Sequence, residues 1–294
     1  MPAEREYDYR TKITLAVSAD GRRIGLHPFE RADRVFDLRR CHIAVPELMT
    51  LWEALRPLRS LTPPRLERLV LRLDRTGGRH VVFRVKSGEA WTGGGRLHDE
   101  LVRRNVTATL WWQPEGGVAR AVAGAAEAFP ATVFEQVHPE MGDRVRAFAL
   151  ELLGAAGGRA VWDLYAGVGE TTALLAAAGA RVESVESDAR AVAEAEARGP
   201  RARRLTGRVE HVLGQLRAPE LVVTNPPRIG MDQRVTAALE RLGPERLVYV
   251  SCDPATLARD LTRLPGYRLS ALKAFDLFPQ TAHVETVALL ERAS

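Results

Sequence analysis

The chain beyond residue 158 alternates between apolar, strand-like segments and helix-like segments. The strand-like segments are RAVWDLYAG, RVESVESD, APELVVTNPPR and RLVYVSCDP, and the helix-like ones are ETTALLAAAGA, ARAVAEAEARG, VTAALERLG and ATLARDLTRL. Two more strand-like segments, YRLSALKAFDLF and HVETVALLER, then follow each other without a helix. Strands separated by helices pair in parallel, whereas consecutive strands form hairpins. Residues 126–294 are therefore predicted to form an α/β domain, a doubly wound and mostly parallel Rossmann-like sheet that ends in an antiparallel hairpin.

Residues 1–125 have a different pattern. Apolar and polar residues alternate on both sides of Asp20-Gly21, a dipeptide typical of β-hairpins. The apolar residues then take helical spacing in ELMTLWEALRPL. Strand-like segments return between residues 66 and 112, separated by glycine-rich turns at 77–78 and 93–95. We expect a smaller N-terminal α+β domain, an antiparallel sheet that carries a helix, with the domain boundary after residue 125.

The two predicted domains differ in charge. The chain has a formal net charge of +5, but its first 125 residues hold 22 Lys and Arg against 15 Asp and Glu, while the other 169 hold 20 against 22. A basic surface attracts polyanions, so nucleic acid is the expected partner, although a solvated, arginine-rich face explains the same surplus. No stretch has the roughly 18 apolar residues of a spanning helix, and the start lacks a signal peptide's apolar run. We expect a cytoplasmic monomer without membrane contact.

A glycine-containing turn joins the first strand and helix of the predicted α/β domain. In VWDLYAGVGETTALLA, Gly167 and Gly169 allow a tight turn, and Asp163 near the strand end can accept hydrogen bonds. No third glycine stands in phosphate-binding register, which disfavours a dinucleotide. Glu186 ends the next strand, where a carboxylate can hold ribose hydroxyls. This pair of features predicts S-adenosylmethionine as the ligand; a tight turn beside a surface acid is the alternative.

The third strand-like segment ends in Asn-Pro-Pro, with Asn225 at the edge of the sheet where ligands of open parallel sheets bind. Two prolines restrict the loop, and an amide has one acceptor and two donors. Asn225 is therefore predicted to contact the edge of a base.

The two cysteines, Cys41 and Cys252, are too few for a four-thiolate zinc or iron–sulfur site, so we expect neither a metal nor a cluster. Cys252 follows an apolar strand directly and precedes a predicted helix cap at Asp253. A helix N-terminus lowers the pKa of a nearby thiol, so this position favours a thiolate. We predict that Cys252 is a nucleophile and that Cys41 is a buried apolar residue.

Glu285 stands at the start of the final strand, close in sequence to His283. The predicted topology allows this turn to fold over the edge of the sheet that carries Cys252. A semi-buried carboxylate there has a raised pKa, suited to a general base. Position alone does not distinguish this arrangement from a solvent-facing acid at a strand start.

These segments together resemble the S-adenosylmethionine-dependent RNA 5-methyluridine methyltransferases, a class I methyltransferase family. The longest similarities are VYVSCDPATLARDL around Cys252 and FDLFPQTAHVETVALLER around Glu285. DLYAGVGE, NPPR and FEQVH fall in the family's order, and YDYRTKITLAVS, GLHPF and RRCHIAVPEL resemble its front domain. The resemblance implies uridine in rRNA or tRNA as the substrate and S-adenosylmethionine as the methyl donor.

The resemblance also assigns roles. It implies that Cys252 adds to C6 of a flipped-out uracil and that Glu285 removes the C5 proton. The residues implied to contact the cofactor or the base, or to shape the cofactor loop, are Gln136, Tyr165, Gly167, Gly169, Glu186 and Asn225. The candidate RNA contacts in the front domain are Tyr9, Arg10 and Lys12, although a tyrosine on a β-strand is as often a core residue as one that stacks on bases.

Three positions depart from the family pattern. Asn225 stands where the family usually has Asp, His138 where it has Asn, and Glu170 where it often has an amide. An amide at 225 can pair with uracil but also with cytosine, which leaves a cytosine-C5 methyltransferase as an alternative. Methyltransferases of exocyclic amines share Asn-Pro-Pro but usually continue with an aromatic residue, whereas Arg228 follows here. An inactive, cofactor-binding RNA chaperone fits the departures but not the intact Cys252 and Glu285.

Overall fold

A computed structural model describes residues 1–28, 30–86, 88–125, 136–199 and 202–293. The chain divides into two compact units, an N-terminal unit of Arg5–Thr132 and a C-terminal unit of Met1–Glu4 with Val133–Ser294. The boundary expected after residue 125 adjoins the segment 126–135, which lies outside the described residues. In the described part of the chain, no helix has both the length and the apolar character needed to cross a bilayer.

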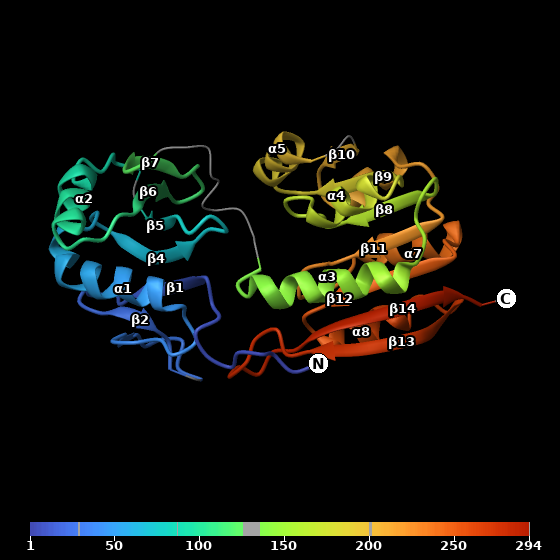
Figure 1. Ribbon diagram of the computed structural model, residues 1–294, viewed down its shortest axis with the longest axis horizontal. Helices are drawn as coiled ribbons and strands as arrows, with labels where there is room; N and C mark the ends of the chain where they lie inside the picture. The colour runs from blue at the N-terminus through green and yellow to red at the C-terminus, as the bar shows by residue number, and fades with distance from the viewer. Residues whose placement is uncertain (29, 87, 126–135, 200–201, 294) are drawn as a thin grey trace. The chain divides into compact units, whose positions relative to one another are not determined.

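The C-terminal unit contains the predicted doubly wound sheet (Figure 1). Its strand order is β10-β9-β8-β11-β12-β14-β13, in which the first five strands run parallel and β14 is antiparallel to both β12 and β13. The strands are β8 (Ala160–Leu164), β9 (Arg181–Glu186), β10 (Arg203–Thr206), β11 (Leu221–Thr224), β12 (Arg246–Ser251), β13 (Tyr267–Phe275) and β14 (Glu285–Arg292). The sequence pattern does not predict β10, because its segment RRLT lacks an apolar run.

Helices cover both faces of this sheet, as the apolar strands require. They are α3 (Pro139–Leu153), α4 (Glu170–Ala177), α5 (Ala189–Arg198), α6 (Val209–Val212), α7 (Gln233–Leu242) and α8 (Pro254–Leu261), with a short 3-10 turn η2 (Leu213–Gln215). Alternate residues of each strand enter one of two hydrophobic clusters. On β12, Val248 and Val250 pack on the α3 side, while Leu247 and Tyr249 pack on the side of α6, α7 and α8. In Figure 1, α3 crosses one face of the sheet and α7 and α8 lie behind it.

The N-terminal unit is a seven-stranded sheet with the order β3-β2-β1-β4-β5-β6-β7. Its elements are β1 (Lys12–Val17), β2 (Ile24–Leu26), β3 (Phe36–Asp37), α1 (Pro46–Leu55), η1 (Arg56–Leu61), β4 (Leu66–Leu73), β5 (Arg79–Val85), α2 (Gly94–Arg103), β6 (Thr109–Pro114) and β7 (Arg120–Ala123). The hairpin predicted at Asp20-Gly21 is confirmed by the antiparallel pairing of β1 and β2. Gly21 has a φ of 70°, a left-handed conformation that glycine adopts without strain.

The prediction of an antiparallel sheet with one helix is wrong at one pair of strands. The residues from Gly94 onward form α2 rather than a turn, and this helix crosses between β5 and β6. A crossover helix returns the chain to the same end of the sheet, so β5 and β6 pair in parallel. The glycines that open α2 conceal its apolar spacing, which begins only at Leu97 and Leu101.

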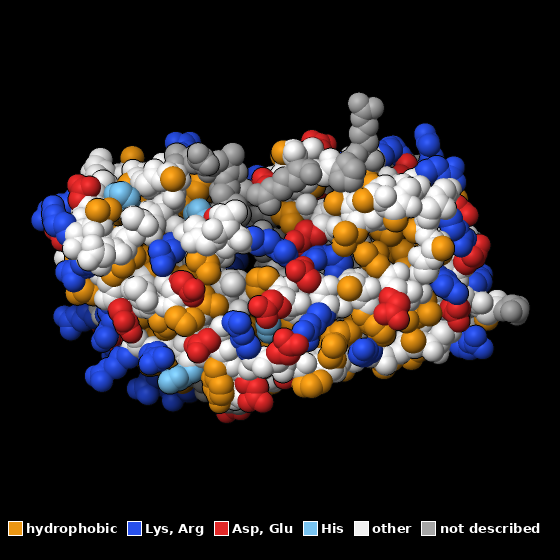
Figure 2. All heavy atoms as spheres, in the orientation of Figure 1, with side chains coloured by type: hydrophobic (Ala, Val, Ile, Leu, Met, Phe, Trp, Pro, Cys, Tyr) orange, Lys and Arg blue, Asp and Glu red, His pale blue; other side chains and the backbone are white. Residues whose placement is uncertain are grey.

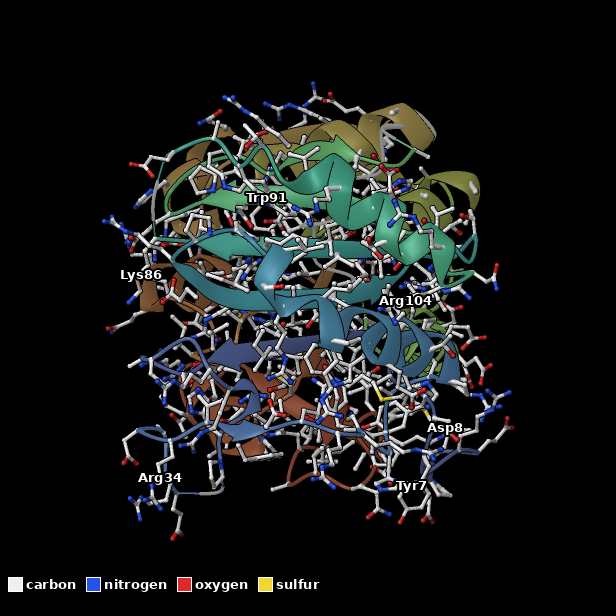
Figure 3. The ribbon with its side chains drawn as sticks, turned by 90° about the vertical axis from the view of Figure 1, so that its left-hand side faces the viewer. Tyr7, Asp8, Arg34, Lys86, Trp91 and Arg104 are labelled. Carbon is white, nitrogen blue, oxygen red and sulfur yellow. The ribbon has the colours of Figure 1, made fainter. Side chains whose placement is uncertain are left out.

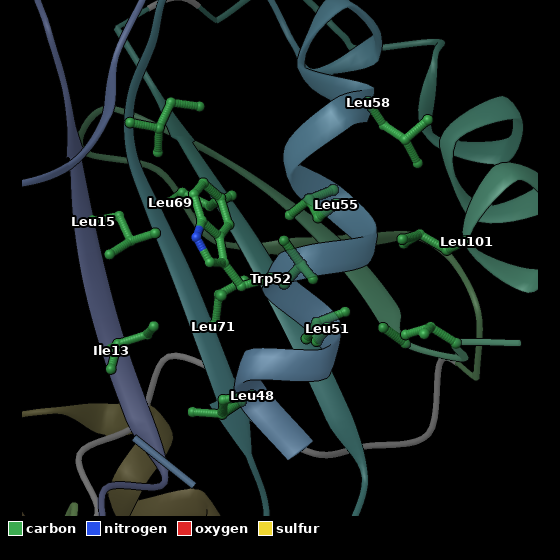
Figure 4. Packing of buried hydrophobic residues seen from close by; sticks show 14 of the residues in the cluster. Ile13, Leu15, Leu48, Leu51, Trp52, Leu55, Leu58, Leu69, Leu71 and Leu101 are labelled. Atoms are coloured by element: carbon green, nitrogen blue, oxygen red, sulfur yellow. The ribbon is translucent and has the colours of Figure 1, made fainter. Parts of the chain in front are cut away.

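The core of the N-terminal unit lies between α1 and the sheet (Figure 4). The four apolar residues that the helical pattern places on one side of α1 are all buried: Leu48, Leu51, Trp52 and Leu55. The indole N–H of Trp52 is satisfied in this core, because Nε1 donates a hydrogen bond to the carbonyl of Leu38 at 3.0 Å. Cys41 is partly buried against the same cluster, close to the expected environment.

Candidate functional site

The predicted site residues of the C-terminal unit gather by topology at one edge of its sheet. The loops that follow β8, β9, β11 and β12 all leave the carboxyl ends of parallel strands. The antiparallel β14 begins at that same edge. The order of strands reverses between β8 and β11, the position at which open α/β sheets bind ligands.

Register places Cys252, the residue after β12, beside Glu285 at the start of β14. Ser251 of β12 pairs with Thr286 of β14, so the next antiparallel position brings Cys252 opposite Glu285. Thr286 strengthens this end of the pair, because its Oγ1 donates to the Ser251 carbonyl at 3.0 Å. Glu285 continues the β14 series whose members Val287 and Leu289 pack on the α3 side. The two residues that the sequence separates by a helix and a strand are therefore adjacent.

The carboxyl group of Glu285 is buried, with only 2% of the residue exposed. Burial disfavours the charged form and raises the pKa of Glu285 from 4.5 to about 7, although the positive charge of Arg228 opposes part of this shift. The environment thus agrees with the prediction of a semi-buried carboxyl with a raised pKa. A group that titrates near neutrality can accept a proton from a carbon acid and release it again.

The expected lowering of the Cys252 pKa is wrong. Burial and the negative charge of Glu285 raise the pKa of the thiol above its ordinary value of 9.0, and Arg228 only partly offsets them. The predicted cap at Asp253 is confirmed, since its carboxylate accepts from the backbone N–H groups of Ala255 and Thr256, both at 3.0 Å. Two N–H groups at the N-terminus of α8 therefore bind a carboxylate rather than the thiol.

Arg228 is a site residue that the sequence analysis treated only as part of a motif. Its positive charge lies close enough to Cys252 and to Glu285 to lower the pKa of both groups. Arg228 belongs to the loop after β11, and only the strand order β11-β12-β14 brings this loop beside the other two residues. The signal available in the sequence was NPPR itself, in which a cation follows the rigid prolines.

The loop after β8 is organised around the carboxylate of Glu186. Glu186 Oε2 accepts from the backbone N–H of Gly167 at 2.9 Å, while Oε1 accepts from Asp188 N at 2.8 Å and from Ser187 Oγ at 3.0 Å. Gly167 and Gly169 have left-handed φ values of 57° and 75°. A side chain at Gly169 would come within 2.9 Å of Ala195, so glycine is required there by space as well.

This loop fits the ribose of S-adenosylmethionine. Glu186 is partly exposed at the end of β9, and a carboxylate offers about four acceptor sites. Three of them are in use, two on Oε1 and one on Oε2, so an acceptor site on Oε2 is left for a hydroxyl group of a ligand. Beneath the loop, burial raises the pKa of Asp163 to about 6, while a hydrogen bond from Thr172 Oγ1 at 2.5 Å favours the ionised form. Asp163 therefore links the end of β8 to Thr172 of α4 inside the domain.

The other predicted ligand contacts take separate positions. Tyr165 has a left-handed φ of 62°, rare for a bulky residue, and its partly buried ring packs against the cluster on the α6 and α7 side. Gln136 lies against α3, where its Cβ and Cγ come within 3.0 Å of the position a Cβ on Gly142 would take. Asn225 is exposed, and its backbone N–H donates to the carbonyl of Leu164 at 3.2 Å. This bond ties the β11 loop to β8.

The structure shows the environment of two residues that depart from the family pattern, Glu170 and His138. Glu170, at the start of α4, forms an ion pair with Arg146, which also pairs with Asp143 at 2.7 Å. His138 is 3% exposed and precedes α3 directly. Among the described residues, no group of three or more His, Cys, Asp or Glu side chains is arranged to hold a metal ion.

Tyr9 does not suit its predicted role as an RNA-stacking residue. It is only 3% exposed, so it presents no free ring face. Arg10 and Lys12 are partly buried. Other cations of the N-terminal unit are exposed, and Figure 2 shows Lys and Arg side chains on the surface of this unit. In Figure 3, Arg34, Lys86 and Arg104 project from separate parts of it.

The sequence is similar to that of known RNA methyltransferases. A family model described as tRNA (Uracil-5-)-methyltransferase matches residues 188–293. An uncharacterised RNA methyltransferase of Streptomyces avermitilis is 34% identical over 100% of this chain and 70% of that protein. The 23S rRNA (uracil(1939)-C(5))-methyltransferase RlmD of Thiobacillus denitrificans is 31% identical over 97% of this chain and 73% of its own length. The chain spans 66% of a further relative, an uncharacterised RNA methyltransferase of Streptomyces coelicolor.

A solved structure shares the whole fold. The crystal structure of Pyrococcus abyssi tRNA (uracil-54, C5)-methyltransferase in complex with S-adenosyl-L-homocysteine matches 99% of this chain and 78% of that chain. The TM-score is 0.72 and the sequence identity 24%. This similarity extends over both units and confirms the predicted combination of a Rossmann-like domain with an N-terminal domain.

Proposed function

The chain belongs to the RNA (uracil-C5)-methyltransferase family, and on that basis we propose that it transfers a methyl group from S-adenosylmethionine to C5 of uridine in rRNA or tRNA. The observation that carries the proposal is the cluster of Cys252, Glu285 and Arg228 at the ligand-binding edge of the sheet. A nucleophile, a base of nearly neutral pKa and a fixed cation are the groups that this reaction requires.

Cys252 begins the reaction by adding through Sγ to C6 of the uracil. The addition breaks the C5–C6 π bond and leaves C5 enolate-like, which makes an otherwise poor carbon nucleophile reactive. Because burial keeps the Cys252 pKa high, the thiolate depends on the guanidinium of Arg228 beside it. When bound, S-adenosylmethionine supplies the electrophilic methyl group that C5 accepts.

Glu285 completes the reaction as the general base. Its carboxylate removes the C5 proton, the electron pair of that C–H bond restores the C5–C6 double bond, and the C6–Sγ bond breaks to return Cys252 as a thiolate. The raised pKa of Glu285 matches this step, because a carboxylate with an ordinary pKa is a weaker base. Glu186, positioned by the backbone N–H of Gly167, holds the donor's ribose, and Asn225 contacts the base or the donor.

Nucleoside analysis tests the proposed reaction. The full chain, incubated with labelled S-adenosylmethionine and unmodified rRNA and tRNA transcripts, is expected to produce 5-methyluridine, detected by mass spectrometry after digestion to nucleosides. The product identity also decides between the alternatives, since 5-methylcytidine would indicate a cytosine-C5 enzyme and an N-methylated base an amine methyltransferase. Donor binding without any methylated product would support the inactive chaperone.

Exposed arginines of the N-terminal unit are proposed to supply electrostatic RNA affinity. Arg39 and Arg40 are both exposed in the segment between β3 and α1. Replacing both by Ala is expected to weaken RNA binding and to reduce the slope of log affinity against log salt by about 1.4–1.8, at 0.7–0.9 per phosphate contact. Filter binding at several salt concentrations measures this slope.

Arg241 provides the matched control, because it is exposed in the last turn of α7, at the edge of the sheet opposite the site. Arg241→Ala is expected to leave the slope unchanged. Equal slopes for the parent and the Arg39→Ala/Arg40→Ala variant would show that these two residues do not contact RNA phosphates.

A further inference from the structure

The loop Arg228–Met231, between β11 and α7, is attached to α8 along its whole length. Thr256 Oγ1 donates to the carbonyl of Arg228 at 2.9 Å, and Arg259 donates to the carbonyl of Ile229 at 2.6 Å. The backbone N–H of Met231 donates to Asp260 Oδ2 at 2.7 Å. Three successive parts of the loop are therefore held by the helix that follows Cys252.

The anchor of this loop is buried, and the loop packs closely against α8 at Gly230. Asp260 is fully buried and also accepts from the hydroxyl of Tyr249 at 2.7 Å. Gly230 has a left-handed φ of 77°, and a Cβ there would lie only 2.4–2.5 Å from atoms of Thr256, Arg259 and Asp260. A loop fixed in this way presents its side chains in one geometry before any substrate binds.

The fixed loop directs its first two side chains to different surroundings. The charge of Arg228 lies close enough to Cys252 to lower the pKa of its thiol, whereas the side chain of Ile229 is exposed to solvent. Ile229 is 72% exposed, the highest value among the large hydrophobic residues that the structure describes. Single exposed apolar residues are ordinary on protein surfaces. This one differs because it is held rigidly and its Cα lies about 3.8 Å along the chain from that of a residue beside the reactive thiol.

We propose that Ile229 is an RNA-contacting residue that packs against the bases next to the extruded uridine. The inference rests on the proposed function, in which the target base leaves its stack to reach Cys252. Extrusion exposes the apolar faces of the neighbouring bases, and nucleic-acid-binding proteins commonly insert an apolar side chain at such a step. An isoleucine on a fixed loop covers these faces without being ordered on binding, and it gains burial that it lacks in the free protein.

The test compares Ile229→Ala with Leu272→Ala. Leu272 is a matched control, because it is 57% exposed on β13 of the same unit. With the unmodified RNA transcripts, Ile229→Ala is expected to lower kcat/KM for RNA about 10-fold, as loss of an apolar contact does. Its affinity for RNA in filter binding is expected to fall in parallel. Ile229→Leu is expected to retain both values, and Leu272→Ala to leave both unchanged.

Two further measurements separate RNA contact from other causes. Ile229→Ala is expected to bind S-adenosylmethionine as tightly as the parent and to unfold at the same denaturant midpoint. Unchanged RNA affinity and kcat/KM in Ile229→Ala would overturn the inference, as would an equal loss in Leu272→Ala or a loss of donor binding. Failure of the proposed function has a different signature, namely a parent chain that makes no methyluridine while Ile229→Ala still binds RNA more weakly than the parent.

Discussion

Cys252→Ser is expected to abolish covalent capture of RNA and to lower the rate of methyl transfer at least about 10⁴-fold, as expected for loss of a covalent nucleophile. A serine hydroxyl is much less acidic than a thiol, so the addition to C6 that activates C5 does not occur. RNA containing 5-fluorouridine makes the step visible, because fluorine at C5 replaces the proton that must leave. The parent enzyme is expected to form an adduct that survives denaturing gel electrophoresis, and Cys252→Ser is expected to form none.

The other cysteine supplies the control. Cys41 lies against the core of the N-terminal unit, and Cys41→Ser is expected to give the same adduct as the parent. Donor binding by Cys252→Ser, measured by calorimetry, establishes that the variant is folded. Methyl transfer at the parent rate by Cys252→Ser would contradict the covalent route and favour a mechanism of the amine-methyltransferase type.

Glu285→Gln is expected to lower turnover about 10²–10⁴-fold, the usual contribution of a general base. The amide occupies the same volume but cannot take the C5 proton, so the methylated intermediate is not released from Cys252. The variant is therefore expected to accumulate a protein–RNA adduct on ordinary uridine-containing RNA, where the parent shows little. Gel analysis with labelled RNA measures the accumulation.

The pH dependence of this variant gives a second measurement. In the parent, the rate is expected to rise as Glu285 loses its proton near pH 7, and this rise is absent from Glu285→Gln. The stability of the parent changes with pH in the opposite direction to its rate. Folding raises the pKa of Glu285 from 4.5 to about 7, so its stabilising contribution is complete below pH 4.5 and is lost as pH rises through about 7. Between pH 5 and 9 the variant should gain about 3 kcal/mol in unfolding free energy relative to the parent, from 1.36 kcal/mol per pKa unit.

Glu291→Gln is the matched control for both measurements. Glu291 stands on the same strand, where hydrogen bonding to Ser270 and the charges of Arg246 and Arg268 lower its pKa. The substitution is expected to leave the adduct, the turnover and the pH profile as in the parent. Loss of every adduct in Glu285→Gln, including that with 5-fluorouridine RNA, would assign Glu285 to binding or folding rather than to proton removal.

The strands and helices of the C-terminal unit follow from local pattern. Apolar runs predicted β8, β9, β11 and β12, and a final pair without a helix predicted the antiparallel β13 and β14. The errors arose where local pattern is weak. The strand β10 is short and polar, and α2 begins in glycines, so the parallel pairing of β5 and β6 was not expected. Both depend on contacts made by residues far apart in the chain.

Part of the candidate site could likewise be predicted from the sequence, and part could not. The chemical groups and their order could be predicted from the residues alone: a thiol after a strand, a capping aspartate, a carboxyl at the start of the final strand and a glycine turn before an acid. Their pKa values depend on the folded arrangement. The pKa of Cys252 rises rather than falls, Glu285 titrates near neutrality, and Arg228 joins them from a third loop. The physical reason is that a pKa depends on burial and on charges in space, which strand order and register set and which neighbours in sequence do not.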